Sequence, residues 1–369
     1  MVMNVLIINL ILFTPDNGVI PQNKSIKDTM IHALCKGFLK GGHSVTLVAS
    51  EEYRPIENES YEFDIVYMRS GLKKIFKPAF LPYPVGLARF LRERAGEFDV
   101  VVSSECFSMG SLVAASILPK KLVIWQEQIA HQRKFFKLPS KIWYNLICKL
   151  YFGKGEVVAC RSERAQSFTS SYLKNVSRTI IEHGVDGEKF NRDLHKKDYV
   201  ITSSQLIKRK NIDHIIRMFS KFIGDKKYEH YKLIIAGRGE EEESLRTLVT
   251  SLGVVDSIEF VGYLPQVELS KLIGGAKAFL IASTQDLNMV SVPECVVCCT
   301  PILMTSVPSS SSYIKAFGLG IVKDKWTEHD LREIIENSEV YVDRCNAYRD
   351  RLLCSSVAES FLSLVKEVQ

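Results

Sequence analysis

The chain alternates short, almost fully apolar runs with helical stretches along both of its halves, and this rhythm limits the possible folds most strongly. The apolar runs are residues 5–12, 44–49, 99–103, 122–125 and 157–160 in the first half, and 199–203, 231–236, 257–261 and 278–283 in the second. Such runs are typical of parallel strands that are buried on both faces and joined by helical crossovers. We therefore predict an α/β fold of two doubly wound, Rossmann-like domains, which place ligands at the carboxyl ends of the strands.

The length agrees with two domains, because 369 residues are many for one hydrophobic core. We predict an N-terminal domain over residues 1–185 and a C-terminal domain over residues 198–350. Apolar spacing predicts a helix over residues 24–40, closed by the glycines at 41 and 42, and a final helix over residues 355–369.

Cysteine usage and hydropathy indicate the compartment. Nine cysteines, an odd number at irregular spacing, argue against a disulfide framework and for a reducing cytoplasm. Cys295, Cys298 and Cys299 lack the second Cys/His pair of a zinc site, so we expect no metal there. The apolar opening run has neither the basic start nor the cleavage site of a secretory signal, and no apolar stretch reaches the ~18 residues of a membrane span.

Positive charge is concentrated in the first half. Residues 1–195 hold 26 Lys and Arg against 19 Asp and Glu, or +7, and the remainder sums to −1, which gives the total of +6. Residues 69–94 and 133–154 are basic and interleaved with aromatic residues, a pattern that favours peripheral contact with an anionic membrane. The alternative is a solvated helix face whose aromatic side chains pack inward. Nucleic acid is not an expected partner, because the charge is local and no nucleic-acid-binding motif occurs.

Two acidic residues, Asp286 and Glu294, lie eight positions apart in the otherwise apolar or small stretch 283–303. A strand-like run precedes them and helical spacing follows from Val290, so they lie where a helix begins beside the carboxyl edge of a sheet. Carboxylates in that place accept hydrogen bonds from sugar and ribose hydroxyls, while free backbone N–H groups face a phosphate. An alternative for Glu294 is a capping box in which Ser291 is the N-cap.

This stretch resembles the nucleotide-sugar motif Glu-x7-Glu of the retaining GT-B glycosyltransferases of family four. Residues 286–294 together with residues 305–313 resemble, within that family, a bacterial surface-polysaccharide type. Asp286 stands where Glu is usual, and Met289 and Cys299 stand where Gly is usual. The resemblance implies that Glu294 binds the ribose, that Asp286 is catalytic and holds the donor sugar, and that Asn288, Met289, Val290 and Ser291 line the donor diphosphate. It also implies a cleft between the two domains, the N-terminal one for the acceptor and the C-terminal one for the donor, with the last helix packing back on the first domain.

Residues 203–211 resemble the phosphate loop of the same family. Lys210 occupies the expected catalytic position, while Gln205 replaces the usual Arg as a donor-binding residue and leaves Lys208 or Arg209 as possible further cations. The Rossmann fingerprint G-x-G-x-x-G is absent, which weighs against an NAD-dependent enzyme.

Three weaker segments follow the family in order: 182–190 like its hinge, 233–245 like its third-strand turn with Gly237, and 260–269 like the turn whose Tyr263 and Leu264 meet the nucleotide base. Together with the phosphate loop they extend the resemblance over ~120 residues of the second half.

The first half resembles the family loosely. Gly18 stands in the loop after the first strand, and Glu127 follows a middle strand; both are assigned to the acceptor. His131, five residues after Gln126, is the candidate for the family's catalytic His, although it could equally be a membrane-side helix residue.

The resemblance implies transfer of a sugar from a nucleotide diphosphate sugar to a lipid-linked or oligosaccharide acceptor, with retention, at the inner face of the cell membrane. No Asp-x-Asp sequence occurs, so the transfer is expected to need no metal and no cofactor. A sugar-nucleotide epimerase of the same fold and a non-catalytic nucleotide-binding member are the alternatives.

Overall fold

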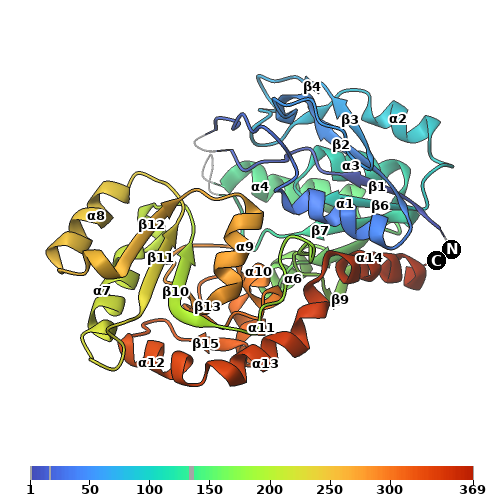
Figure 1. The fold of residues 1–369 in the computed structure, drawn as a ribbon. Coiled ribbons are helices and arrows are strands. Elements are labelled where there is room, and N and C mark those ends of the chain that lie inside the picture. The colour runs from blue at the N-terminus through green and yellow to red at the C-terminus, as the bar shows by residue number, and fades with distance from the viewer. Residues whose placement is uncertain (1, 16–17, 133–136, 369) are drawn as a thin grey trace. The chain divides into compact units, whose positions relative to one another are not determined.

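The computed structural model describes residues 2–15, 18–132 and 137–368, which form two compact units. Unit 1 comprises Met1–Gly184 and Cys354–Gln369, and unit 2 comprises Val185–Leu353. Each unit is a parallel sheet with helices on both of its faces, so the predicted doubly wound α/β class is confirmed (Figure 1).

The sheet of unit 1 has seven strands in the order β3-β2-β1-β6-β7-β8-β9. Its strands are β1 Asn4–Ile8, β2 Ser44–Ser50, β3 Asp64–Met68, β6 Val100–Ser104, β7 Leu122–Gln126, β8 Val157–Cys160 and β9 Val176–Ile180, beside a short antiparallel pair, β4 Ser70–Gly71 and β5 Tyr83–Pro84. Its helices are α1 Met30–Lys40, α2 Leu87–Glu93, α3 Met109–Ile117, α4 Leu138–Ile142, α5 Cys148–Tyr151, α6 Glu163–Ser170 and α14 Cys354–Val368. A π-helical turn, Trp143–Ile147, joins α4 to α5.

The first helix is shorter than predicted. It begins at Met30 rather than at residue 24, because Thr29 is extended and its side chain accepts a hydrogen bond from the His32 N–H, which caps the helix.

Helix α14 packs against α1 within unit 1. A Cβ at Gly37 would collide with the carbonyl of Cys354, and the ring of Phe361 lies 6.3 Å from that of Phe38 and 5.3 Å from that of Trp125. The last helix is therefore part of the core of unit 1.

The sheet of unit 2 has six strands in the order β12-β11-β10-β13-β14-β15, and the order reverses between β10 and β13. Its strands are β10 Lys197–Ser203, β11 Lys232–Ala236, β12 Ile258–Gly262, β13 Ala276–Ile281, β14 Ile302–Met304 and β15 Gly320–Val322. Its helices are α7 Ile212–Ile223, α8 Glu242–Ser251, α9 Gln266–Gly275, α10 Ser291–Val297, α11 Ser311–Ala316, α12 Glu328–Glu336 and α13 Ser338–Tyr348. A ligand of such a sheet lies outside the carboxyl ends of the strands at the reversal, here β10 and β13.

No helix within the described ranges is long and apolar enough to cross a bilayer.

Candidate functional site

The loops that follow β10 and β13 bring Lys210 and Asp286 into contact, because the two strands are neighbours and parallel. The Lys210 ammonium donates a hydrogen bond to Asp286 Oδ2. Two further bonds fix the loops to each other. The Thr284 N–H donates to the Arg209 carbonyl at 2.9 Å, and Asn211, in the left-handed region at φ 56°, donates from Nδ2 to the Ala282 carbonyl at 3.2 Å.

Asp286 has more than one partner. Arg209 Nη1 lies 3.4 Å from Asp286 Oδ2, and the Ser283 hydroxyl donates to the same oxygen at 3.3 Å. The Lys210 and Asp286 side chains are 10% and 13% exposed, whereas Arg209 is 41% exposed. Two cations against one carboxylate leave the cluster of Lys210, Arg209 and Asp286 with a net charge of +1, which favours an anionic ligand beside it. Sequence reasoning gave Arg209 only a secondary place, because the family's Arg aligns with Gln205.

Glu294 lies in α10, and its residue is 7% exposed. The capping-box alternative is wrong, because Val290 is the N-cap in helical conformation, Ser291 is the first residue of the helix, and no side chain caps it. Gln266, at the first position of α9, donates instead from Nε2 to Glu294 Oε1 at 3.5 Å. The carboxylate thus faces the start of α9 rather than its own helix terminus.

The donor-binding candidates Gln205, Gly237, Tyr263 and Leu264 lie in the segments that follow the carboxyl ends of β10, β11 and β12. A Cβ at Gly237 would collide with the Ser204 carbonyl beside Gln205, and the Gly237 N–H donates to the Gly262 carbonyl at 2.7 Å. Tyr263 and Leu264 follow Gly262 and lead into α9; Tyr263 is 65% exposed. Hydrogen bonds therefore connect the 204–206 loop, the turns after β11 and β12, and Glu294 along one edge of the sheet.

The residues between the two acids differ in exposure. Met289 is buried, and its sulfur accepts from the Ser283 hydroxyl at 3.9 Å; Val290 is 39% exposed. Within the described residues, the buried side-chain amide of Asn288 has no hydrogen-bond partner, and neither have the hydroxyls of Ser309 and Ser310. A Ser309 N–H bond to the Leu287 carbonyl, 2.8 Å long, brings that serine loop against the motif. The two serines were not predicted as site residues.

In unit 1, Glu127 follows β7 and pairs with Arg161, which follows the neighbouring β8, at 2.8 Å. The Arg161 guanidinium also lies 3.7 Å from the centre of the Trp125 ring. Glu105, which follows β6 and has a left-handed φ of 66°, accepts from the backbone N–H of Glu127 at 2.8 Å. The carboxyl ends of three neighbouring strands therefore share one polar network.

Burial governs the acidity of this region. It raises the pKa of Glu105 to about 7, against the opposing effect of Arg161. It raises the pKa of Glu182, which follows β9, to about 8, again opposed by Arg161. Perturbed carboxyls at the carboxyl edge of a parallel sheet indicate a candidate binding region.

His131 uses both ring nitrogens inside unit 1. Its Nδ1 lies 3.1 Å from the Ser140 hydroxyl and its Nε2 lies 2.9 Å from the Tyr172 hydroxyl, amid the rings of Tyr144 and Phe168. Burial, together with Lys141 and Lys137, lowers the pKa of His131 and keeps the ring neutral. The geometry is that of a bridge between α4 and the turn that follows α6.

Gly18 is exposed, has a positive φ of 83° and offers open space to a side chain. The preceding residues 16–17 of the predicted acceptor loop lie outside the described residues.

The two basic segments expose mostly aliphatic side chains, together with the aromatic Tyr83 and Tyr151, which are 36% and 42% exposed. Trp143, Tyr144 and Phe152 are buried, so for these residues the inward-packing alternative is correct. Leu138, Ile142, Leu146 and Leu150 are 49–58% exposed at four-residue spacing, beside exposed lysines at 137, 141 and 149. Residues 133–136 of the second segment lie outside the described residues.

The first segment exposes Leu72 and Ile75 next to Lys73 and Lys74. It neighbours the second through Phe107, whose ring lies 5.6 Å from that of Phe80 and 5.2 Å from that of Trp143.

In the part of the chain that the structure covers, no three His, Cys, Asp or Glu side chains are arranged to hold a metal ion. All nine cysteines are buried and none forms a disulfide within the described residues, and burial raises the pKa of Cys298 to about 12. These thiols pack as small apolar side chains.

Two family models match the chain in succession. "Glycosyltransferase Family 4" matches residues 28–189, and "Glycosyl transferases group 1" matches residues 186–342. Together the two models span residues 28–342.

Among curated relatives, the chain is 24% identical over 190 residues to an alpha-monoglucosyldiacylglycerol synthase of Streptococcus pneumoniae, which covers 47% of this chain and 42% of the relative. It is 25% identical over 254 residues to the GalNAc-alpha-(1->4)-GalNAc-alpha-(1->3)-diNAcBac-PP-undecaprenol alpha-1,4-N-acetyl-D-galactosaminyltransferase of Campylobacter jejuni, covering 65% of this chain and 64% of the relative. The matches thus span less than two thirds of either relative.

Among solved structures, the fold is similar to that of Anabaena Alr3699/HepE in complex with UDP, at 12% identity and a TM-score of 0.69, covering 99% of this chain and 100% of that one.

Proposed function

We propose that this chain, which belongs to the glycosyltransferases of GT-B fold, transfers a sugar from a nucleotide diphosphate sugar to a lipid-linked or surface-polysaccharide acceptor and retains the anomeric configuration. The observation that carries the proposal is the contact of Lys210 with Asp286 at the strand-order reversal of unit 2, on the same sheet edge as Glu294.

In this proposal the donor lies along the carboxyl edge of unit 2. Glu294, which faces the start of α9, accepts the ribose hydroxyls, and the turn with Tyr263 and Leu264 lies beside it for the base. Asp286 accepts hydroxyls of the donor sugar and opposes the positive charge that develops at the anomeric carbon.

Lys210 and Arg209 stabilise the departing diphosphate. Each already lies within 4.0 Å of Asp286, so their charges are fixed in place before the reaction. As the bond from the anomeric carbon to the diphosphate breaks, negative charge grows on the leaving group, and positioned cations lower the energy of that state most. Two cations supply this stabilisation without a metal ion, which supports the proposed independence from metal and cofactor. Arg209 restores the guanidinium that Gln205 does not provide.

The acceptor is assigned to unit 1. Its carboxyl-edge network offers the Glu127 carboxylate, which is 27% exposed and held by the buried Arg161, to the hydroxyls of a glycan, and Gly18 lies in the loop after β1. His131 is proposed as a positioning residue rather than a proton carrier, because Ser140 and Tyr172 occupy both ring nitrogens.

A membrane-borne acceptor is supported by two observations. The names of the two curated relatives specify a diacylglycerol glycolipid and an undecaprenol-linked glycan. The exposed aliphatic row 138–150 with its neighbouring lysines has the chemistry of a surface that binds anionic lipid headgroups. We propose that the protein acts at the inner face of the cell membrane, in surface-polysaccharide synthesis of the capsule or lipopolysaccharide kind.

The test is nucleotide release from a set of nucleotide sugars, measured with and without a bacterial lipid extract as acceptor. Acceptor-dependent release, with an NMR-defined anomeric configuration equal to that of the donor, is the expected result. Acceptor-independent conversion of the sugar would favour an epimerase, and binding without turnover would favour a non-catalytic member.

A further inference from the structure

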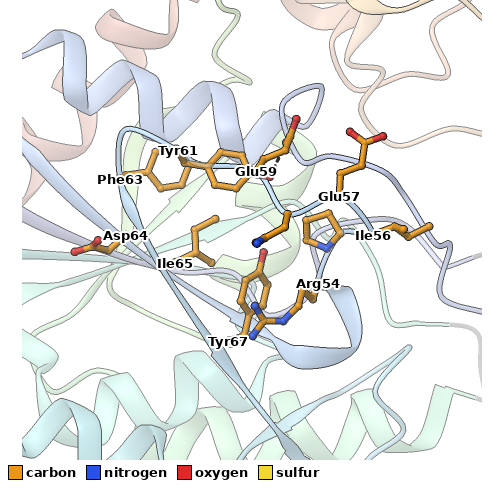
Figure 2. Close-up of a pocket in the computed structure, with 11 residues that line it drawn as sticks. Arg54, Ile56, Glu57, Glu59, Tyr61, Phe63, Asp64, Ile65 and Tyr67 are labelled. Carbon is orange, nitrogen blue, oxygen red and sulfur yellow. Dashed lines mark hydrogen bonds between the residues drawn. The ribbon is translucent and has the colours of Figure 1, made fainter.

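A hollow of about 410 Å³ lies in unit 1, beside the terminal strand of its sheet (Figure 2). Phe63 and the strand β3 that follows it, with Ile65 and Tyr67, form one wall, and the loop 54–59 forms the other. Figure 2 shows the Tyr61 and Phe63 rings on one side and the Tyr67 ring beside Arg54 on another. The volume falls within the range of about 300–1,000 Å³ that is typical of small-molecule sites.

The loop over this hollow is held from its far side. The N–H groups of Ile56 and Glu57 donate to the carbonyls of Asn23 and Lys24 at 2.9 and 3.1 Å. Glu59 accepts from the Tyr61 hydroxyl at 2.9 Å and pairs with Lys27 at 3.0 Å. The hollow therefore has two fixed walls rather than a single surface loop.

The lining favours a neutral, polar ligand. Three of its four charged side chains already have a partner of opposite sign: Arg54 has Glu51, Glu57 has Lys24 and Glu59 has Lys27. An ionic ligand gains little electrostatic attraction where the charges are already compensated. A fully apolar ligand would displace the water that solvates these polar groups and would offer no hydrogen bonds in its place.

One polar group of the lining has no partner. The buried Tyr67 hydroxyl makes no hydrogen bond to any residue that the structure describes. It points toward the loop 54–59 in Figure 2, and the exposed Arg54 guanidinium covers the ring face at 4.1 Å. Burial raises the pKa of Tyr67, so the phenol keeps its proton and remains a donor. An unpaired buried hydroxyl destabilises a protein, and a ligand oxygen that replaced the missing partner would remove that cost.

We infer that this hollow is a carbohydrate-binding subsite, in which Tyr67, Asn58 and the loop carboxylates bind the hydroxyls of a glycan, while Tyr61 and Phe63 contact its carbon faces. Hydroxyls both donate and accept, so one neutral ligand can satisfy a phenol, an amide and carboxylates together. The inference rests on the proposed function for the identity of the ligand as a glycan. The subsite would bind the glycan on unit 1 independently of the donor site.

The test is saturation-transfer NMR and calorimetry on the full chain with maltotriose, cellotriose and triacetylchitotriose as probes. We expect at least one trisaccharide to bind. Tyr67→Phe, which keeps the ring and removes one hydrogen bond, should weaken binding about threefold to tenfold. Asn58→Trp, at an exposed position of the loop, should fill the hollow and abolish binding.

Two controls separate this inference from the proposed function. Tyr341→Phe, a matched change in unit 2, should leave trisaccharide affinity unchanged. Lys210→Met should impair transfer but retain trisaccharide binding, so the subsite can stand even where the transferase proposal fails. The inference is overturned if no trisaccharide binds, if binding survives both Tyr67→Phe and Asn58→Trp, or if Lys210→Met alone removes it.

Discussion

Replacing Lys210 by methionine removes the cation that contacts Asp286 and keeps most of the side-chain volume. An orphaned buried carboxylate costs about 3–5 kcal/mol. Asp286 is not orphaned, because Arg209 remains 3.4 Å away and the Ser283 hydroxyl 3.3 Å away. At an effective dielectric constant of about 20 the Arg209 attraction amounts to about 5 kcal/mol before desolvation, and its 41% exposure reduces that value. We therefore expect unit 2 to lose about 1–2 kcal/mol of unfolding free energy.

The catalytic loss should be larger than the loss of stability. Removing one preorganised donor to a developing negative charge costs about 2.7–4 kcal/mol of transition-state energy, or a factor of about 10²–10³ in kcat. The assay is single-turnover release of nucleotide diphosphate at saturating donor, with urea unfolding of the same preparation. Arg209→Met should lose less activity, because its side chain is the more exposed of the two cations.

A double-mutant cycle decides whether the two side chains act together. The unfolding free energies of Lys210→Met, of Asp286→Asn and of the variant with both substitutions should give a coupling free energy of about 0.5–3 kcal/mol. A folded Lys210→Met protein with kcat within threefold of the unchanged protein would refute the reasoning.

The other predictions concern the ribose, the membrane and the sheet edge of unit 1. Glu294→Gln should raise the KM for the donor at least tenfold in steady-state assays, because an amide accepts ribose hydroxyls less strongly than a carboxylate. Leu146→Ser with Leu150→Ser, which are 52% and 57% exposed, should weaken binding to anionic vesicles in sedimentation assays about thirtyfold, since burying each half-exposed Leu in lipid contributes roughly 1 kcal/mol. The unfolding free energy should fall as pH rises from about 7 to 8, above the range in which histidines titrate, because the raised pKa values of Glu105, about 7, and Glu182, about 8, mean that the folded state binds more protons than the unfolded state in that window. The slope contributed by Glu182 is at most about 1.4 kcal/mol per pH unit, and Glu182→Gln should remove it in urea titrations.

The vesicle experiment has a matched control. Val255→Ser with Val340→Ser removes two aliphatic side chains of unit 2 that are 56% and 48% exposed. Equal loss of vesicle binding in both double variants would contradict a role for the 138–150 row. For the pH experiment, a stability that rises between pH 7 and 8 would contradict the assigned burial of the two carboxyls.

The sequence predicted the fold well because buried parallel strands have a recognisable composition. The run 231–236 is apolar on both sides of the strand, and β11 occupies Lys232–Ala236 with four of its five residues buried. Boundaries set by capping were harder to predict: Met30 begins α1 only because Thr29 caps it, a contact that apolar spacing does not reveal.

Site residues that lie within a sequence motif were predictable from the sequence. Contacts that only the tertiary structure creates were not. Asp286 and Lys210 were named from separate segments, and the neighbouring strands β10 and β13 place them in contact. The role of Arg209 depends on how the turn 208–210 approaches Gln285 and Asp286, which no local pattern encodes. The orientation of the aromatic residues in 133–154 was not predictable for a similar reason. Their spacing among basic residues favours a membrane-facing surface, but Trp143 and Tyr144 pack into the core of unit 1.

The most direct test of the donor site is calorimetric titration of the full chain with UDP, GDP and ADP, repeated on Lys210→Met and on Glu294→Ala. The account predicts that the unchanged protein binds at least one diphosphate and that each substitution weakens that binding at least tenfold while the chain stays folded. Equal affinity in all three proteins, or no binding of any nucleotide by the unchanged chain, would contradict it.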